Sequence, residues 1–278
     1  MNRNMMRWPD GKRRAVTLSY DDGTVFDRRL VEILDRYGLV GTFNLNSGLF
    51  AAVDADKGRM TKEATYALFA ASPHEIAVHG ERHLSLPTVP ESVAVLDVLN
   101  DRVALEAMFG RLVQGMAYAY GTCDDGVAQI LHNAGIRYAR TTVSTERFDV
   151  PRDWLRMPAT CHHKNPRLFE LATKFIEDTD GWNSPPMLFY LWGHSYEFNN
   201  DGNWDVIERF AAYIGSRDNV WYATNGEIYR YVAAFDALEF SACGDCVYNP
   251  TVTDVFIHYM NRDYRIGAGK TVALVPRI

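Results

Sequence analysis

Apolar runs alternate with amphipathic segments along most of this chain. Short runs rich in β-branched and aromatic residues predict strands at residues 14–20, 40–46, 74–78, 116–120, 136–142, 154–160, 187–192 and 220–224. Segments with apolar residues three or four positions apart predict helices at residues 26–37, 61–71, 90–112, 127–134, 166–177, 204–214 and 227–235. Strands that alternate with helices are typical of a parallel sheet with right-handed crossover connections.

The number of strand–helix units favours one of two α/β folds. Seven or eight repeats favour a (β/α) barrel, and a doubly wound open sheet is the alternative. After residue 237 the pattern changes to short apolar runs at residues 238–240, 246–248, 254–259 and 271–274, with turn residues between them. We therefore predict a barrel over residues 1–237 and a small C-terminal β extension over residues 238–278. The extension would pack on the barrel or take part in a homodimer.

In a (β/α) barrel, functional side chains follow the carboxyl ends of the strands. These positions of the predicted strands carry Asp21, Asp22, Asn44, Asn46, His79, His83, Tyr118, Tyr120, Arg140, His162, His163, His194, Asn225 and Glu227. The pattern predicts that these side chains converge on one mouth of the barrel. Tyr118 and Tyr120 alternate along one predicted strand, so we expect both on the same face.

Composition and charge argue against a nucleic-acid or membrane partner. A formal net charge of −6, without a cluster of Lys and Arg, argues against a nucleic-acid partner. Residues 1–14 lack the apolar core of a signal peptide, and no apolar run approaches the about 18 residues that span a bilayer. We therefore expect a cytoplasmic location and no membrane partner. Cys243 and Cys246 have redox-motif spacing but flank a predicted hairpin turn, so we expect free thiols.

The most informative segment is Asp21-Asp22-Gly23, which follows the first predicted strand. Adjacent carboxylates before a glycine also occur in solvated turns. A second signal, His79 and His83 four positions apart, follows the third predicted strand. One carboxylate and two imidazoles can bind zinc and leave coordination positions open, as a catalytic site requires. The remaining carboxylate could then accept a proton as a general base.

These motifs resemble those of the polysaccharide deacetylases, the NodB-homology proteins of carbohydrate esterase family four. The Asp-Asp-Gly segment is similar to the first family motif and the His-x-x-x-His spacing to the second. The Leu-Trp-Gly-His sequence at residues 191–194 is similar to the late Leu-x-His motif, displaced by one residue. The resemblance spans residues 14–231. It implies the family's irregular barrel and a hydrolase that removes acetyl groups from N-acetylated or O-acetylated sugars or oligosaccharides.

The resemblance also implies a role for each motif residue. Asp22, His79 and His83 would hold one divalent metal ion, with zinc as the best match to these ligands. Asp21 would be the general base, and His194 would protonate the departing amine. A backbone N–H near Tyr120 would stabilise the oxyanion. The candidate substrate contacts are the neighbouring residues of the predicted mouth, Tyr118, Tyr120, Arg140, His162 and Trp192.

Two positions depart from the family pattern. Gly80 stands where the family usually has Ser or Thr, and Ala117 replaces the arginine that orients the catalytic base. Arg140, one predicted strand further along, is a candidate replacement, because a guanidinium can hold a carboxylate through parallel hydrogen bonds. A solvent-facing arginine on the rim is the alternative.

Other interpretations of the site stay open at this point. His194 could be a hydrogen-bonded core residue, and we expect one of His162 and His163 on the rim and the other exposed. A second metal site formed by these two histidines and Cys161 is a weaker hypothesis. For the whole chain, the alternatives are a metal-independent hydrolase of cyclic amides or ureides on the same scaffold and a non-catalytic carbohydrate-binding protein.

Overall fold

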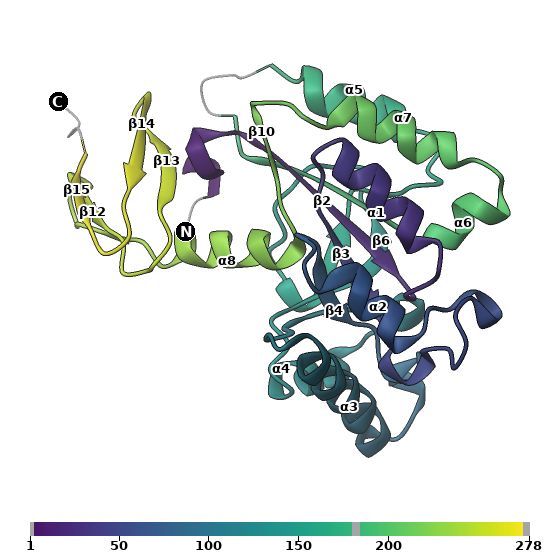
Figure 1. Cartoon of the computed structure of the whole chain (residues 1–278). Helices are drawn as coiled ribbons and strands as arrows, with labels where there is room; N and C mark the ends of the chain where they lie inside the picture. The colour runs from purple at the N-terminus through teal and green to yellow at the C-terminus, as the bar shows by residue number, and fades with distance from the viewer. Residues whose placement is uncertain (1–2, 180–183, 275–278) are drawn as a thin grey trace.

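A parallel sheet forms the centre of the computed structural model, which describes residues 3–179 and 184–274 of the chain (Figure 1). Its nine strands run in the order β7-β6-β5-β4-β3-β2-β9-β8, with β10 also paired to β2. Every pairing among them is parallel. The strands are β2 (Arg14–Asp21), β3 (Gly41–Leu45), β4 (Glu75–Val78), β5 (Gly115–Ala117), β6 (Tyr138–Ser144), β7 (Met157–Ala159), β8 (Cys161–His162), β9 (Met187–Gly193) and β10 (Val220–Tyr222).

The sheet closes because one short segment pairs with both of its edges. β7 pairs with β6, and β8, which begins two residues later, pairs with β9. Between them, the Thr160 N–H donates to the Tyr190 carbonyl at 2.9 Å. Residues 157–162 therefore complete the ring of strands, and the predicted irregular (β/α) barrel is confirmed.

Helices surround this barrel (Figure 1). Thr61 is the N-cap of α2, and its Oγ1 accepts a hydrogen bond from the Ala64 N–H at 3.1 Å. Gly135, with φ of +76°, follows the end of α4. In the described residues the helices are α1 (Asp27–Arg36), α2 (Lys62–Phe69), α3 (Glu91–Phe109), α4 (Asp125–Asn133), α5 (Leu168–Glu177), α6 (Ser195–Asn200), α7 (Trp204–Ile214) and α8 (Asn225–Asp236), with 3₁₀ turns η1 (Arg3–Met5), η2 (Pro9–Gly11), η3 (Ser47–Leu49), η4 (Asp56–Gly58), η5 (Leu86–Thr88), η6 (Ala119–Gly121) and η7 (Trp154–Arg156).

Two predicted strands are shorter in the structure than in the sequence pattern. The strand predicted at residues 116–120 ends at Ala117, and the chain turns through η6, in which Tyr120 has φ of +58°. Tyr118 is therefore buried while Tyr120 is 67% exposed, and the prediction that they share a face is wrong. The strand predicted at residues 154–160 begins with η7, which the Asp153 side chain caps at the Leu155 N–H.

The C-terminal extension contains two three-stranded antiparallel sheets, in the orders β1-β13-β14 and β11-β12-β15. They lie beyond α8, away from the barrel strands (Figure 1). One strand comes from the N-terminal segment, because β1 (Met6–Arg7) pairs with β13. The others are β11 (Glu239–Phe240), β12 (Cys246–Tyr248), β13 (Val255–Tyr259), β14 (Arg262–Ile266) and β15 (Thr271–Ala273). The division at residue 237 stays a prediction, to which the structure adds this N-terminal strand.

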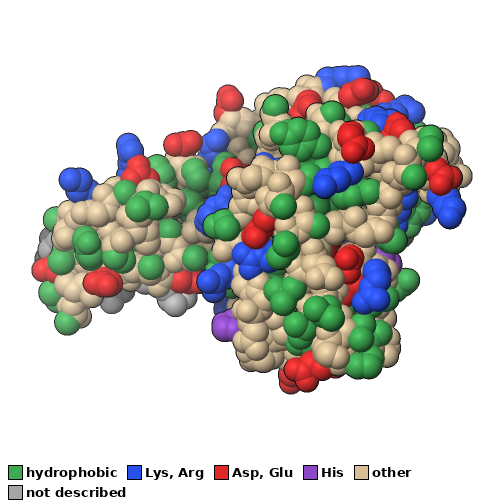
Figure 2. Space-filling view, turned by 60° about the horizontal axis from the view of Figure 1, so that its bottom comes forward, with side chains coloured by type: hydrophobic (Ala, Val, Ile, Leu, Met, Phe, Trp, Pro, Cys, Tyr) green, Lys and Arg blue, Asp and Glu red, His purple; other side chains and the backbone are tan. Residues whose placement is uncertain are grey.

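The expectation of free cysteine thiols is confirmed. All four cysteines are free thiols. On the face drawn in Figure 2, acidic and basic side chains are mixed over both the barrel and the extension. Within residues 3–179 and 184–274, no helix combines the length and the apolar character needed to cross a bilayer. The homodimer stays a prediction.

Candidate active site

Strand register brings the motif residues to one end of the barrel. Tyr20 of β2 lies opposite Gly193 of β9, so the residues that follow, Asp21 and His194, are neighbours across this pair. On the other side of β2, Asp21 lies opposite Asn44 of β3. Leu45 of β3 in turn lies opposite Val78 of β4, which His79 follows. The first and late motifs therefore meet because β2 and β9 are adjacent and in register, and the second motif joins them because β3 aligns β4 with β2.

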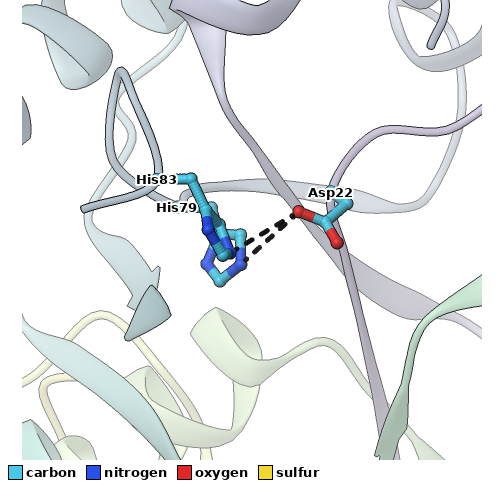
Figure 3. A group of neighbouring side chains, drawn as sticks. All are labelled: Asp22, His79 and His83. Carbon is cyan, nitrogen blue, oxygen red and sulfur yellow. Dashed lines mark ion pairs between the residues drawn. The ribbon is translucent and has the colours of Figure 1, made fainter. Parts of the chain in front are cut away.

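Asp22, His79 and His83 form a cluster with space between their polar atoms (Figure 3). Asp22 Oδ1 lies 4.0 Å from His79 Nε2 and 3.7 Å from His83 Nε2. His79 Nδ1 lies 2.8 Å from the Ala117 carbonyl, and its buried Nε2 has no hydrogen-bond partner among the described residues. A histidine that donates Nδ1–H to a carbonyl presents the Nε2 lone pair, which is the usual arrangement of a metal ligand. The residues therefore fit a divalent ion.

Arg59 and Asn46 link the two ligand-bearing loops. Asp22 has φ of +84°, a left-handed conformation that is strained for a non-glycine residue. Arg59 donates to the Asp22 carbonyl and to Asn46 Oδ1, the latter at 3.3 Å. Asn46 Nδ2 in turn donates to the carbonyls of His79 and Gly80 at 2.9 and 2.7 Å. These contacts hold the strained Asp22 in place beside the histidine loop.

The glycine at position 80 has a structural cause. Gly80 has φ of +84°, and a Cβ atom there would lie 2.5 Å from Asp97 Oδ2. Asp97 is buried and accepts the Arg82 N–H at 3.0 Å. A Ser or Thr side chain, as is usual in the family at this position, would therefore collide with the carboxylate that supports the loop.

Asp21 is a buried, charged carboxylate held from two sides. Its Oδ2 accepts from Arg140 Nη2, and its Oδ1 accepts from Asn44 Nδ2 at 2.8 Å. Burial raises the pKa of Asp21, but the charges of Arg140, His79 and His194 outweigh burial and lower the pKa to about 2. Asp21 is therefore ionised at neutral pH, as a general base must be.

Arg140 occupies the place that the missing arginine leaves open. It lies on β6 directly opposite Ala117 on β5. Its guanidinium therefore reaches the site from the neighbouring strand, at the same level of the barrel. It is fully buried, and its guanidinium carbon lies 4.4 Å from the centroid of the Trp192 ring. The alternative of a solvent-facing rim arginine is therefore wrong, and Arg140 contacts the carboxylate of Asp21 instead.

His194 lies between the two aspartates and a carboxylate that the sequence interpretation missed. Its Nε2 is 3.8 Å from Asp21 Oδ2 and 4.0 Å from Asp22 Oδ2, and its Nδ1 is 3.1 Å from Glu197 Oε2. Burial lowers the pKa of His194, but the Glu197 hydrogen bond and the two aspartates outweigh it, so the pKa is raised. The His-x-x-Glu spacing at the start of α6, a capping box, is the signal that could have found Glu197.

His162 and His163 converge on the same Glu197 oxygen. His162 Nε2 lies 3.1 Å and His163 Nε2 lies 3.3 Å from Oε2, while Lys164 Nζ lies 3.2 Å from Oε1. The prediction that one of these histidines is exposed is wrong, because His163 is buried and His162 is half-buried. Burial and the neighbouring His162 lower the pKa of His163 to about 3, so its imidazole is neutral.

Three of the predicted substrate contacts do not offer a free side chain to the mouth. Tyr118 is buried, and its hydroxyl donates to the Leu155 carbonyl at 2.8 Å. Trp192 is covered by Arg140 and by the His162 ring, whose centroid is 4.5 Å away. Arg140 itself is committed to Asp21. Tyr120, exposed beside His83 at a centroid distance of 4.6 Å, and the half-buried His162 remain candidates for substrate contact.

Asn225 and Glu227 do not join the mouth, contrary to the sequence prediction. β10 pairs only with the start of β2, and its last residue, Tyr222, lies opposite Val16. Asn225 consequently bonds inside the barrel, where its Nδ2 donates to the Tyr190 hydroxyl at 2.6 Å. Glu227 accepts the Thr224 N–H at 2.8 Å and caps α8.

Asp27 at the start of α1 supplies a pH-dependent prediction. Its Oδ1 accepts from Ser195 Oγ at 2.5 Å, and its other oxygen has no partner among the described residues. Burial, more than any other cause, raises the pKa of Asp27 to about 7. Because the folded state holds this proton more tightly than the unfolded state, stability from this group should fall as the pH rises from about 4 to 7. The free energy of unfolding of the metal-loaded protein in urea, measured across this pH range, should therefore decline less steeply in Asp27→Asn than in the wild type.

The matched control for this prediction is Asp56→Asn. Asp56 is exposed, so its removal should leave the decline unchanged. If the free energy of unfolding depended on pH equally in the wild type and in Asp27→Asn, the role assigned to Asp27 would be contradicted.

Comparison with known proteins places this site in a family context. Residues 9–139 match the family model described as polysaccharide deacetylase. A search of curated proteins finds no match to the sequence. The fold is shared with a Mycobacterium smegmatis protein provisionally described as a polysaccharide deacetylase, at 20% identity and a TM-score of 0.58, over 84% of this chain and 94% of that chain.

Two further solved structures extend the comparison. A chitin deacetylase from the fungal pathogen Colletotrichum lindemuthianum matches at 20% identity and a TM-score of 0.52, over 77% of this chain and 86% of that chain. The Streptococcus pyogenes deacetylase PplD matches at 18% identity and a TM-score of 0.46, over 50% of this chain and 61% of that chain. This chain therefore spans less than two thirds of PplD. The family match over residues 9–139, with the shared fold, confirms the predicted resemblance to the polysaccharide deacetylases, a family of carbohydrate-deacetylating hydrolases.

Proposed function

We propose that this protein is a metal-dependent deacetylase that releases acetate from an N-acetylated sugar or oligosaccharide, with O-acetyl esters as a related substrate class. One observation carries the proposal: an ionised carboxylate and a histidine, Asp21 and His194, lie beside each other and beside a cluster suited to a divalent ion. Asp21 Oδ2 is 3.8 Å from both His79 Nε2 and His194 Nε2. Amide hydrolysis needs this combination, because the water must lose a proton and the amine must gain one.

The roles of the chain's own residues follow from their contacts. When bound, a divalent ion supplies a Lewis acid that polarises the acetyl carbonyl and makes a water more acidic. Asp21, held by Arg140 and Asn44, would accept the proton of the attacking water at its carboxylate. His194 would give a proton from Nε2 to the departing nitrogen, and a backbone N–H near Tyr120 would donate to the developing oxyanion.

Glu197 decides which nitrogen of His194 takes part. Its carboxylate accepts from His194 Nδ1, which leaves Nε2 directed toward Asp21 and Asp22. Glu197 also accepts the His194 backbone N–H at 3.2 Å, so it fixes the ring from the first turn of α6. We assign Glu197 as a positioning residue for the general acid.

His194→Ala should slow amide hydrolysis by about 10²–10⁴-fold with the metal retained. The effect on an activated acetyl ester should be far smaller, because a phenolate leaving group departs without a proton. Turnover of an N-acetylated oligosaccharide and of an aryl acetate, measured on protein of known metal content, checks this. Equal losses on both substrates would show that His194 does not act as the acid.

The proposed function is tested by a substrate screen. Metal-free and zinc-reloaded protein are incubated with N-acetylated sugars, O-acetylated sugars and cyclic ureides, and acetate and ring-opened product are measured. Acetate release that requires reloading supports the proposal. Ureide opening by metal-free protein would support the metal-independent alternative, and sugar binding without acetate release would support the carbohydrate-binding alternative.

A further inference from the structure

We infer that His162, His163 and Glu197 form a second divalent-metal site, which an ion occupies when metal is in excess and which then inhibits turnover. The site lies between the end of β8, with the residue that follows it, and the first turn of α6. Only the inhibitory consequence rests on the proposed function, because the binding of the ion depends on these three side chains alone.

The geometry of the three side chains suits a small cation. Their ligand atoms lie within 4.8 Å of one another, and the two Nε2 atoms lie 3.1 and 3.3 Å from Glu197 Oε2. Bond lengths of about 2.0–2.1 Å in tetrahedral zinc sites place neighbouring ligand atoms roughly 3.3 Å apart. The His162 and Glu197 side chains are 21% and 17% exposed, so an ion from solvent can reach them.

His163 supplies the observation that points to a missing ligand. It is buried, and neither of its ring nitrogens has a hydrogen-bond partner among the described residues. Its Nδ1 side packs against Gly193, where a Cβ atom would lie 2.0 Å from Nδ1. The rings of Phe198 and Tyr20 stack on it at 4.1 and 5.9 Å, which fixes the plane of the imidazole. Nε2 lies 3.3 Å from Glu197 Oε2 without the geometry of a hydrogen bond, and a cation between the two atoms would bind both.

Two contacts make this site weaker than the cluster of Asp22, His79 and His83. The Lys164 N–H donates to His162 Nδ1 at 3.1 Å, an arrangement that places the ring proton on Nε2; an ion at Nε2 therefore requires this proton to move to Nδ1 and the bond from the Lys164 N–H to break. The Lys164 ammonium also lies 3.2 Å from Glu197 Oε1 and competes with a cation for the carboxylate. His79 has the opposite arrangement, with Nδ1 against a carbonyl and Nε2 free.

Occupation of the second site should impair the general acid. Glu197 Oε2 is the atom that accepts from His194 Nδ1, and the ion would bind the same oxygen. His194 would lose its hydrogen-bond acceptor and gain a nearby positive charge. The step that needs the proton of His194 should therefore slow, while the residues that hold the first ion are untouched.

The test is zinc binding by equilibrium dialysis and elemental analysis on the full chain. The wild type should bind two equivalents, the second at least about ten times more weakly than the first. His162→Ala and His163→Ala should each bind one, while His83→Ala, which damages the first site, should keep the weaker equivalent. Because His163 is buried and its variant could unfold, His162→Ala with an unchanged circular dichroism spectrum carries the conclusion. Lys164→Gln, the matched control, should bind the second ion more tightly.

Activity measurements separate this inference from the proposed function. In the wild type, acetate release should fall once free zinc exceeds the dissociation constant of the second ion, whereas His162→Ala, compared with its own rate at one equivalent of zinc, should show no fall. Saturation at one equivalent, or a second equivalent that persists in both histidine variants, would overturn the second site. A second equivalent on a protein without deacetylase activity would overturn the proposed function alone.

Discussion

Asp21→Asn should retain its metal ion and lose turnover by about 10²–10⁴-fold, the usual contribution of a general acid or base. The substitution keeps the shape of the side chain and removes only its charge and its capacity to accept a proton. Asp21 is buried and accepts from both Arg140 and Asn44, so the amide can keep its oxygen toward Arg140, while its NH2 group would face the donor Asn44 and cost some stability. Asp22→Asn should have the opposite profile, because Asp22 faces both histidines of the cluster and its loss should weaken metal binding itself.

The two aspartate variants are compared by metal content and by turnover on the same preparations. Zinc retained after reloading with one equivalent is measured by elemental analysis, and kcat is measured at the same one-equivalent loading, below the free zinc at which the second ion binds. The account requires one equivalent in Asp21→Asn and a reduced content in Asp22→Asn. Equal metal loss in both variants would show that the roles of base and ligand have been assigned wrongly.

Arg140→Lys should preserve the fold and the metal and reduce turnover at least about tenfold, which corresponds to about 1.4 kcal/mol in the barrier. The guanidinium contacts Asp21 while it packs over the Trp192 ring. Lysine keeps the charge but lacks the planar fork that fixes a carboxylate and stacks on an aromatic face. Asp21 would then be ionised but free to rotate away from the attacking water.

The matched control is Arg147→Lys, because the Arg147 side chain is 73% exposed and pairs with the exposed Asp149. Its turnover should equal that of the wild type within the error of measurement. A harsher change, Arg140→Met, should also destabilise the protein, since removal of one partner of a buried ion pair leaves the other charge uncompensated. Wild-type kcat in Arg140→Lys would show that orientation of Asp21 by a guanidinium contributes nothing.

The parts of the site that sequence predicts well are those fixed by strand order. Asp21, Asp22 and His79 follow apolar runs that become strands β2 and β4 of one parallel sheet, separated only by β3, so their convergence depends on the alternation of strands and helices and on the parallel sheet. Arg140 is of the same kind, because its place one strand beyond the expected arginine comes from the same repeat. In the structure Arg140 lies opposite Ala117. The sequence pattern allows this pairing but does not specify it.

The parts that sequence predicts poorly depend on where a strand ends and on contacts distant in sequence. The spacing of Tyr118 and Tyr120 is that of alternate residues in a strand. However, β5 ends at Ala117, and the following turn η6 directs Tyr120 to the other side. His163 is buried by Phe198, which belongs to a six-residue helix too short for a clear period. Glu197 lies on the same helix, and its importance follows only from the histidines that surround it. The prediction that Asn225 lies at the mouth is wrong because β10 pairs only with the first residues of β2. The periodicity of the sequence does not show how far along β2 this pairing extends.

The measurement that tests the central claim most directly is a zinc titration of metal-free protein with acetate release from an N-acetylated oligosaccharide as the readout. The account predicts that turnover rises linearly to a break at one equivalent of zinc, and that His79→Ala and His83→Ala remain inactive across the same range. Full turnover before any zinc is added, or a fully loaded protein that releases no acetate from any acetylated sugar, would contradict it.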